Sequence, residues 1–248
     1  MRPDLTDTQV HMPHFSTAWF DDKIEYWSRE LAPLKDRPSL RFLEIGCFEG
    51  RATHWMLENI LTHPTSSIDV IDTFEGSPEH EGEQYQNIIR TLRGIFEHNI
   101  EQFRSKVRIH QGYSQEVLPS FQMLGPVFDF IYVDGSHHQD DVYRDAVLVW
   151  PLLKDGGILA FDDYRWTWKD SITGEVQSPK IGINRFLEEY RGDFALLHKL
   201  WQLHVRKRPT TSFEQLLLSV RWVWPFSKLP IRRSKIVGAL QKLGLATS

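Results

Sequence analysis

Short apolar runs and segments of helical spacing alternate along most of this 248-residue chain. Such an alternation predicts βαβ units and therefore a parallel sheet. Most of the runs are apolar on both faces, as expected of strands that helices cover on either side. The expected strands lie at 40–45, 67–72, 106–110, 128–134 and 156–162.

Helical spacing and a late pair of strands complete the predicted architecture. The expected helices lie at 18–31, 51–61, 85–103, 139–153 and 182–191, and 110–119 reads as a polar loop. The stretch 194–208 is expected to form two antiparallel strands. The fold class is therefore α/β, with a Rossmann-like, mostly parallel sheet of seven strands, helices on both faces and an antiparallel final strand. We divide the chain into an N-terminal helical segment over the active site (1–39), a core (40–208) and a C-terminal helical extension (209–248).

Composition places the chain among ordinary globular proteins, with 41% hydrophobic and 25% charged residues. The single cysteine, Cys47, excludes an intramolecular disulfide and is typical of a reducing compartment. The N-terminus has no apolar signal-peptide core, and no apolar run approaches the roughly 20 residues that a membrane span needs. We therefore expect a cytoplasmic protein.

Charge is distributed unevenly around a net value of −4. Residues 209–248 carry six Lys or Arg side chains and one acid, Glu214, whereas the preceding residues carry 23 basic and 32 acidic groups. An acidic body argues against nucleic acid as a partner. The basic extension leaves two interpretations open, a helix on a membrane surface or a packed or oligomer-forming helix, and we favour the second.

A glycine-containing loop follows the first expected strand. In "FLEIGCFEGRATHW" (42–55), Gly46 and Gly50 permit a tight turn and a close approach of the backbone to a ligand. The spacing differs from the G-x-G-x-x-G of dinucleotide folds, and Glu44 would repel a pyrophosphate. A carboxylate suits an ammonium group or a ribose hydroxyl, and S-adenosylmethionine carries both without a phosphate.

Two further strand ends add candidate cofactor ligands. Asp72 ends the second strand, where an acid can accept hydrogen bonds from ribose hydroxyls, and Ser114 lies in the polar loop after the third strand, near the adenine. The full candidate set for the cofactor is Glu44, Gly46, Gly50, Asp72, Thr73, Gly112, Ser114 and Asp134.

Three carboxylates follow the fourth and fifth strands. Asp134 ends one, and Asp162 and Asp163 end the other, so all three are expected at one edge of the sheet. Oxygen ligands of this kind favour Mg²⁺ or another hard divalent cation. Successive side chains on a strand face opposite ways, so the backbone must turn at the strand's exit to bring Asp163 back. A solvated strand end is the alternative.

A metal at this edge would lower the pKa of a substrate hydroxyl and orient it. His137 is our candidate for the base that removes the proton, with Asp134 or His138 as substitutes. Asp145 is expected to support the site. Tyr164, Trp166 and Trp168, together with Phe15 and Trp19, either wall the acceptor or belong to the core.

The sequence resembles class I S-adenosylmethionine-dependent methyltransferases, within them the macrocin-type O-methyltransferases and related bacterial small-molecule enzymes. The resemblance covers residues 40–190 and rests on "RFLEIGCFEGRATHWMLENIL", "IDVIDTFEGSPEH", "DFIYVDGSHHQDDVYRDAVLVWPLLKDGGILAFDDY" and "PKIGINRFLEEY". It implies that Glu44 and Gly46 hold the methionine moiety of the cofactor and that Asp72 holds the ribose. Metal-dependent members carry an Asp after strand four and an acidic or amide pair after strand five, which Asp134, Asp162 and Asp163 match.

The expected activity is methyl transfer to a hydroxyl of a small metabolite or sugar, assisted by a divalent metal. Two alternatives remain. One is a metal-independent methyltransferase that modifies nitrogen, carboxylate or hydroxyl through His137 or Asp134. The other is a non-catalytic module that binds the cofactor or a partner.

Overall fold

The computed structural model describes residues 12–77, 83–169 and 174–209. The chain divides into two compact units, the first comprising residues up to Leu40 with Cys47–Gly112, and the second Arg41–Gly46 with the residues from Tyr113 onward. The predicted helix of the basic extension lies outside the described residues. Within the described ranges, none of the helices combines the length and apolarity that crossing a membrane requires.

Seven strands form one sheet in the order β3-β2-β1-β4-β5-β9-β8. The pairs β2–β3, β1–β4 and β4–β5 are parallel, and β9 runs antiparallel to both β5 and β8. The predicted fold class is thus confirmed, including its antiparallel final strand. The strands are β1 (Arg41–Ile45), β2 (Ser67–Asp72), β3 (Val107–Gln111), β4 (Phe128–Val133), β5 (Leu153–Phe161), β8 (Phe194–Lys199) and β9 (Leu203–Lys207).

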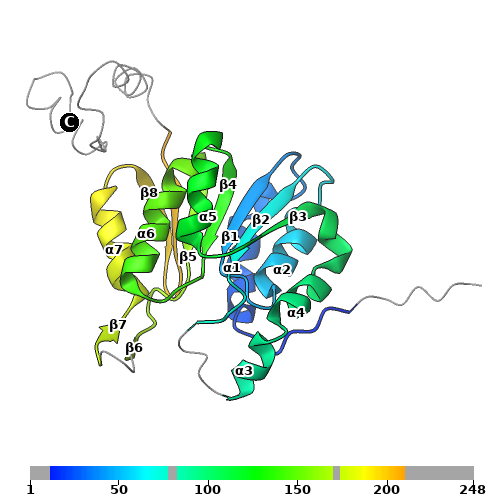
Figure 1. Ribbon diagram of the computed structural model, residues 1–248. Coiled ribbons are helices and arrows are strands. Elements are labelled where there is room, and N and C mark those ends of the chain that lie inside the picture. The colour runs from blue at the N-terminus through cyan, green and yellow to red at the C-terminus, as the bar shows by residue number, and fades with distance from the viewer. Residues whose placement is uncertain (1–11, 78–82, 170–173, 210–248) are drawn as a thin grey trace, which may run out of the picture. The chain divides into compact units, whose positions relative to one another are not determined.

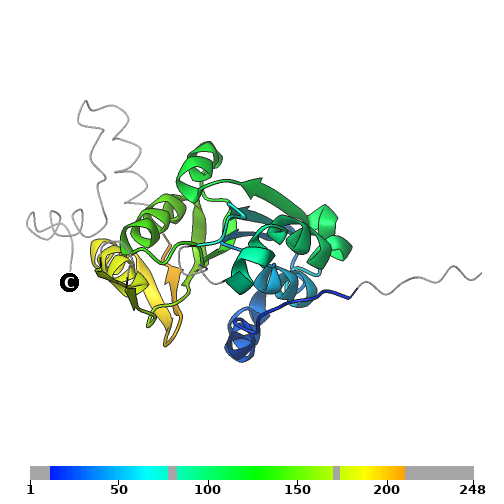
Figure 2. The same ribbon diagram turned by 60° about the horizontal axis from the view of Figure 1, so that its bottom comes forward.

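Helices of the second unit lie side by side along its strands (Figures 1 and 2). They are α5 (Ser114–Phe121), α6 (Gln139–Val149) and α7 (Pro179–Glu189). A Cβ atom on Gly182 of α7 would lie 2.0 Å from the carbonyl oxygen of Gln139, so glycine is what lets α7 approach α6. Phe161 of β5 and Phe186 of α7 are fully buried between these layers, with their rings 5.7 Å apart.

The first unit contains α1 (Ile24–Glu30), α2 (Arg51–Asn59), α3 (Glu83–Ile89) and α4 (Leu92–Asn99). Its N-terminal segment is anchored by rings, since Trp27 packs edge-on against Phe20 and Trp55 at 5.0 and 6.0 Å. The backbone of His14 forms hydrogen bonds in both directions with the amide of Asn99, which is fully buried. The helix predicted at 18–31 is present but shorter, since α1 begins at Ile24 after a 3₁₀ turn at Asp21–Lys23.

Three local predictions were wrong. The expected helix at 85–103 is broken between α3 and α4 at Arg90 and Thr91, where Thr91 has a non-helical φ of −123°. The polar loop predicted at 110–119 becomes helix α5, because Leu118 and Phe121 bury an apolar face despite Pro119. Strand β5 begins at Leu153, three residues before the strand expected at 156–162. A small hairpin of β6 (Trp168–Lys169) and β7 (Val176–Gln177) was not predicted.

Candidate active site

Strands β4 and β5 end at the same level and deliver acids to one edge of the second unit. Val133 and Phe161 are paired across the two strands, so the next residues, Asp134 and Asp162, leave the sheet together. The amide of Asp162 donates to the carbonyl of Val133 at 3.0 Å, and that of Asp134 donates to Ile45 at 2.8 Å. Parallel pairing therefore continues to the last residue before the acids, which fixes where their backbones lie.

Asp163 adopts a left-handed backbone conformation with a φ of 52°. The Oδ1 atom of Asp162 accepts the amide proton of Asp163 at 2.7 Å, and the carbonyl of Asp163 accepts from the amide of Trp166 at 2.9 Å. Such a conformation is strained for a residue with a Cβ and persists where surrounding contacts hold it. This turn moves Asp163 out of the strand's alternation and toward the edge where Asp134 lies.

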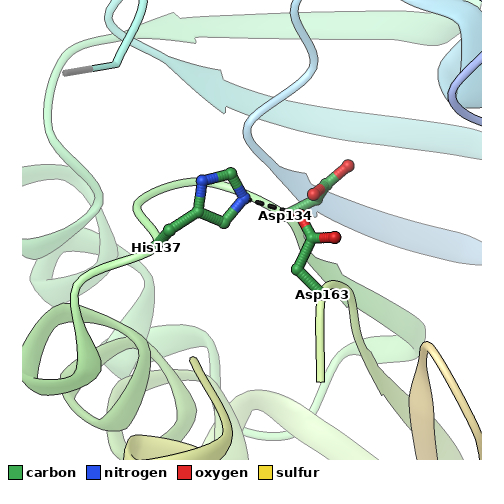
Figure 3. A group of neighbouring side chains, drawn as sticks. All are labelled: Asp134, His137 and Asp163. Atoms are coloured by element: carbon green, nitrogen blue, oxygen red, sulfur yellow. Dashed lines mark ion pairs between the residues drawn. The ribbon is translucent and has the colours of Figure 1, made fainter. Parts of the chain in front are cut away.

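Three side chains converge at this edge, as Figure 3 shows. One ligand atom from each of Asp134, His137 and Asp163 lies within 4.8 Å of the others. His137 Nε2 lies 2.7 Å from Asp163 Oδ2, which is the distance of an ion pair when the imidazole is protonated. Asp162 is not part of this group, because its carboxylate faces the hydroxyl of Tyr132 and the amide of Asp163. The structure thus brings together two of the three predicted metal ligands and the predicted base.

Burial and mutual repulsion perturb the groups at this edge. Burial, followed by the negative charges of Asp162 and Asp163, raises the pKa of Asp134 well above its usual range. Burial and the charges of Asp134 and Asp162 also raise the pKa of Tyr132, so its hydroxyl keeps its proton. A site with this excess of negative charge is suited to a cation.

Aromatic rings adjoin the two histidines. The ring of His137 lies 4.7 Å from that of Trp166, and the ring of His138 lies 5.1 Å from that of Trp168. Both tryptophans are half-buried. Of the aromatic residues considered from the sequence, these two therefore adjoin the site, whereas Tyr164 is buried in the core.

The second unit also holds Glu44, Gly46 and Ser114 of the predicted cofactor set. Glu44 is buried on β1, beside Tyr132 of β4. The hydroxyl of Ser114 donates to Asp145 Oδ1 at 2.5 Å, so Asp145 supports Ser114 from the neighbouring helix. At Gly46 the φ is +79°, and a Cβ atom there would lie 2.1 Å from the carbonyl oxygen of Asp134.

Replacing Gly46 by Ala is expected to destabilise the protein far more than the same change at Gly156. Both glycines have positive φ, at +79° and +78°, but a Cβ atom at Gly156 meets nothing within 4 Å. Left-handed strain alone costs about 1–2 kcal/mol. Urea unfolding should give that loss for Gly156→Ala and several kcal/mol for Gly46→Ala, and equal losses would contradict a role for close backbone approach.

The first unit holds Gly50, Asp72, Thr73 and Gly112. Asp72 Oδ2 accepts the amide protons of Cys47 and Phe48 at 2.7 and 3.1 Å, and Oδ1 accepts that of Phe74 at 2.7 Å. The amide of Gly112 donates to the carbonyl of Asp72 at 2.9 Å. Sequence reasoning did not anticipate that Asp72 holds the glycine loop in place. Glu49, which follows Phe48 in the same loop, anchors the N-terminal segment, because its carboxylate accepts a hydrogen bond from the amide of Ser16.

Asp145 is expected to make the stability of the protein depend on pH. Burial raises its pKa to about 7, so the folded state favours the protonated carboxyl. Its contribution is fully present below the unfolded pKa of about 4 and is lost as pH rises through 7. Between pH 5 and 8 the wild type should lose about 2–3 kcal/mol of unfolding free energy relative to Asp145→Asn. A pH-independent difference in urea unfolding would contradict this assignment.

Comparison with known proteins identifies the fold and a matching family model. Residues 43–164 match the family model of a methyltransferase domain. An uncharacterized protein of Acanthamoeba polyphaga mimivirus is 24% identical over 174 residues, covering 63% of this chain and 69% of that protein.

Solved structures share the architecture at low identity. The O-methyltransferase TomG of Streptomyces achromogenes, solved with S-adenosylmethionine, has a TM-score of 0.53 at 17% identity, over 80% of this chain and 84% of its own. The mycinamycin-pathway methyltransferase MycE, solved with Mg, S-adenosylhomocysteine and mycinamycin VI, has a TM-score of 0.50 at 16% identity, over 79% and 51% of the two chains.

The fold is thus that of the S-adenosylmethionine-dependent methyltransferases. Residues 43–164 match the model of the methyltransferase-domain family, in agreement with the predicted class. The group Asp134, His137 and Asp163 lies inside these residues.

Proposed function

We propose that this protein transfers the methyl group of S-adenosylmethionine to a hydroxyl of a small molecule, with the help of a divalent cation. The observation that carries the proposal is the convergence of Asp134, His137 and Asp163 at the ends of β4 and β5, within the methyltransferase domain. It joins carboxylates that suit a hard cation to an imidazole that suits proton transfer.

The donor set of this site fits Mg²⁺. We propose that Asp134, Asp162 and Asp163 hold the ion, because Mg²⁺ prefers carboxylate oxygens to imidazole nitrogen. The Oδ2 atom of Asp162 faces the hydroxyl of Tyr132 and its Oδ1 atom accepts the amide proton of Asp163, so both carboxylate oxygens are held at this edge. When bound, the cation would lower the pKa of the acceptor hydroxyl and neutralise the excess of negative charge.

His137 then takes the proton of the acceptor. In this step the hydroxyl oxygen forms a bond to the methyl carbon, the carbon–sulfur bond breaks with its electrons passing to sulfur, and the proton moves to the imidazole. The contact of His137 with Asp163 would stabilise the imidazolium that results. His138 and Asp134 are the alternative bases.

For the cofactor we propose the residues predicted from the sequence: Glu44, Gly46, Gly50, Asp72, Thr73, Gly112, Ser114 and Asp134. Asp72 Oδ1 accepts one amide proton in the structure and keeps a lone pair for a ribose hydroxyl. The hydroxyl of Ser114 donates its hydrogen bond to Asp145, so the hydroxyl oxygen can still accept a hydrogen bond from the amino group of adenine. The cofactor complex of TomG supports the same choice of cofactor.

The acceptor that we propose is a small hydroxylated metabolite or sugar, in line with the mycinamycin bound to MycE. Trp166 and Trp168, beside the two histidines, would contact its apolar face. We place the reaction in the cytoplasm on the strength of the single cysteine.

The proposed function is tested by calorimetric titration with S-adenosylhomocysteine and Mg²⁺, and by methyl transfer to a panel of catechols and glycosides. We expect both ligands to bind, and turnover to stop with EDTA and return with Mg²⁺. Turnover that ignores EDTA would instead favour the metal-independent alternative. Failure to bind S-adenosylhomocysteine would exclude the function altogether.

A further inference from the structure

A fully buried chain of hydrogen bonds lies beneath the acidic edge of the second unit. Gln202 Nε2 donates to the hydroxyl oxygen of Tyr132 at 3.2 Å, and His204 Nε2 lies 3.0 Å from Gln202 Oε1. The hydroxyl of Tyr132 in turn faces Oδ2 of Asp134, at 2.9 Å, and Oδ2 of Asp162. Tyr132, Gln202 and His204 are each at most 1% exposed.

The chain of donors runs in one direction only. An amide nitrogen donates and never accepts, so the contact with Gln202 occupies the oxygen of Tyr132 as an acceptor. The single phenolic proton is then shared between the two carboxylates, which only accept when they are ionised. The amide oxygen of Gln202 only accepts, so the proton between it and His204 belongs to His204 Nε2. Each member thereby fixes the orientation of the next.

Strand register places these groups in one row. Tyr132 pairs with Ala160 of β5, and Ala160 pairs with His204 of β9. Residues paired across neighbouring strands project from the same face of a sheet. The small side chain of Ala160 therefore lies between two large polar ones, which leaves Gln202 room to reach the tyrosine hydroxyl. An apolar core does not require polar side chains at these buried positions, so burial alone does not explain why they lie there.

We propose that Tyr132 is a positioning residue that holds the carboxylates of Asp134 and Asp162 in the geometry that binds the divalent cation, and that Gln202 and His204 orient its hydroxyl for this role. The inference rests on the proposed function, because it concerns the same cation. It adds Tyr132, Gln202 and His204, which would act on the cation through the two carboxylates. Asp162 passes the constraint on, because its other oxygen holds the left-handed turn at Asp163.

The first test is Mg²⁺ titration of the apoprotein by calorimetry. Tyr132→Phe removes only the hydroxyl and is expected to raise the Kd for Mg²⁺ by about 10- to 100-fold, as outer-shell changes do. Gln202→Leu should raise it in the same direction by less. The matched control is Tyr143→Phe, which removes a tyrosine–carboxylate hydrogen bond to Glu189 elsewhere in this unit and should leave the Kd unchanged. Equal Kd values for Tyr132→Phe and Tyr143→Phe would overturn the proposal.

A second measurement needs no metal and separates this inference from the metal requirement. The Tyr132→Phe change is made in the wild type and in the Asp162→Asn variant, and the Tm of each protein is measured in EDTA. Because the two side chains act together, we expect the change to lower the Tm more in the wild-type background than in the Asp162→Asn background. Equal decreases would overturn the proposal. A wild type that binds no Mg²⁺ would refute the metal part of the proposed function, and with it the role toward the cation, even if the Tm values showed that Tyr132 orients Asp162.

Discussion

Replacing Asp134 by Asn is expected to weaken Mg²⁺ binding by more than about 100-fold and to lower methyl transfer accordingly, since even outer-shell changes cost 10- to 100-fold. Asp134 belongs to the cluster within 4.8 Å and follows directly on β4, so no neighbouring side chain can take its place. The amide keeps one oxygen acceptor for the hydroxyl of Tyr132 but loses the charge. Calorimetry with Mg²⁺ and measurement of S-adenosylhomocysteine release would give both numbers.

Asp129→Asn is the matched control for this change. Asp129 lies at the other end of β4 and pairs with Lys154 at 2.8 Å, so its loss should lower stability without changing the affinity for Mg²⁺. The assignment of Asp134 would be wrong if both variants bound Mg²⁺ as the wild type does. A loss of folding in Asp134→Asn, seen by circular dichroism, would direct the test to Asp163→Asn instead.

Replacing His137 by Gln is expected to lower kcat by about 10²- to 10⁴-fold, the usual contribution of a general base, while Mg²⁺ affinity stays within a few-fold of the wild type. Its Nε2 atom lies beside Asp163 and its ring beside Trp166, but the three proposed ligands of the ion are carboxylates. The pH profile of kcat should also lose the rise that deprotonation of a base produces.

The same measurements on His138→Gln decide between the two histidines. A large loss of kcat in that variant, with His137→Gln active, would move the base to His138. A strong loss of Mg²⁺ affinity in His137→Gln would show that His137 is a ligand, as its place in the three-residue group allows.

Most of the fold was predictable because strand and helix periods are local properties of the chain. The parallel strands were expected within a few residues of β1–β5, and the antiparallel finish corresponds to β8 and β9. Helix α5 was missed because Pro119 and its polar neighbours outweigh Leu118 and Phe121 until their burial is known. Helix breaks such as that at Thr91 likewise depend on packing that spacing does not reveal.

The candidate site was predictable as a set of residues but not as an arrangement. That Asp134, Asp162 and Asp163 end strands follows from the sequence, whereas the partner of each carboxylate does not. Asp163 turns toward His137 because Asp162 and the amide of Trp166 hold its φ at 52°. That conformation is unfavourable in isolation, so local preference could not have predicted it.

By itself, the sequence determined the succession of strands and helices along the chain, the glycine turn at Gly46 and the position of each acid at a strand end. These follow from side-chain periodicity and from the conformational freedom of glycine, which act over a few residues. Only the tertiary structure decided that Asp72 would hold the amides of Cys47 and Phe48 and that Tyr132 would meet Gln202, 70 residues away. Such contacts depend on which strands lie side by side, and the antiparallel return of β9 is what brings Gln202 to Tyr132.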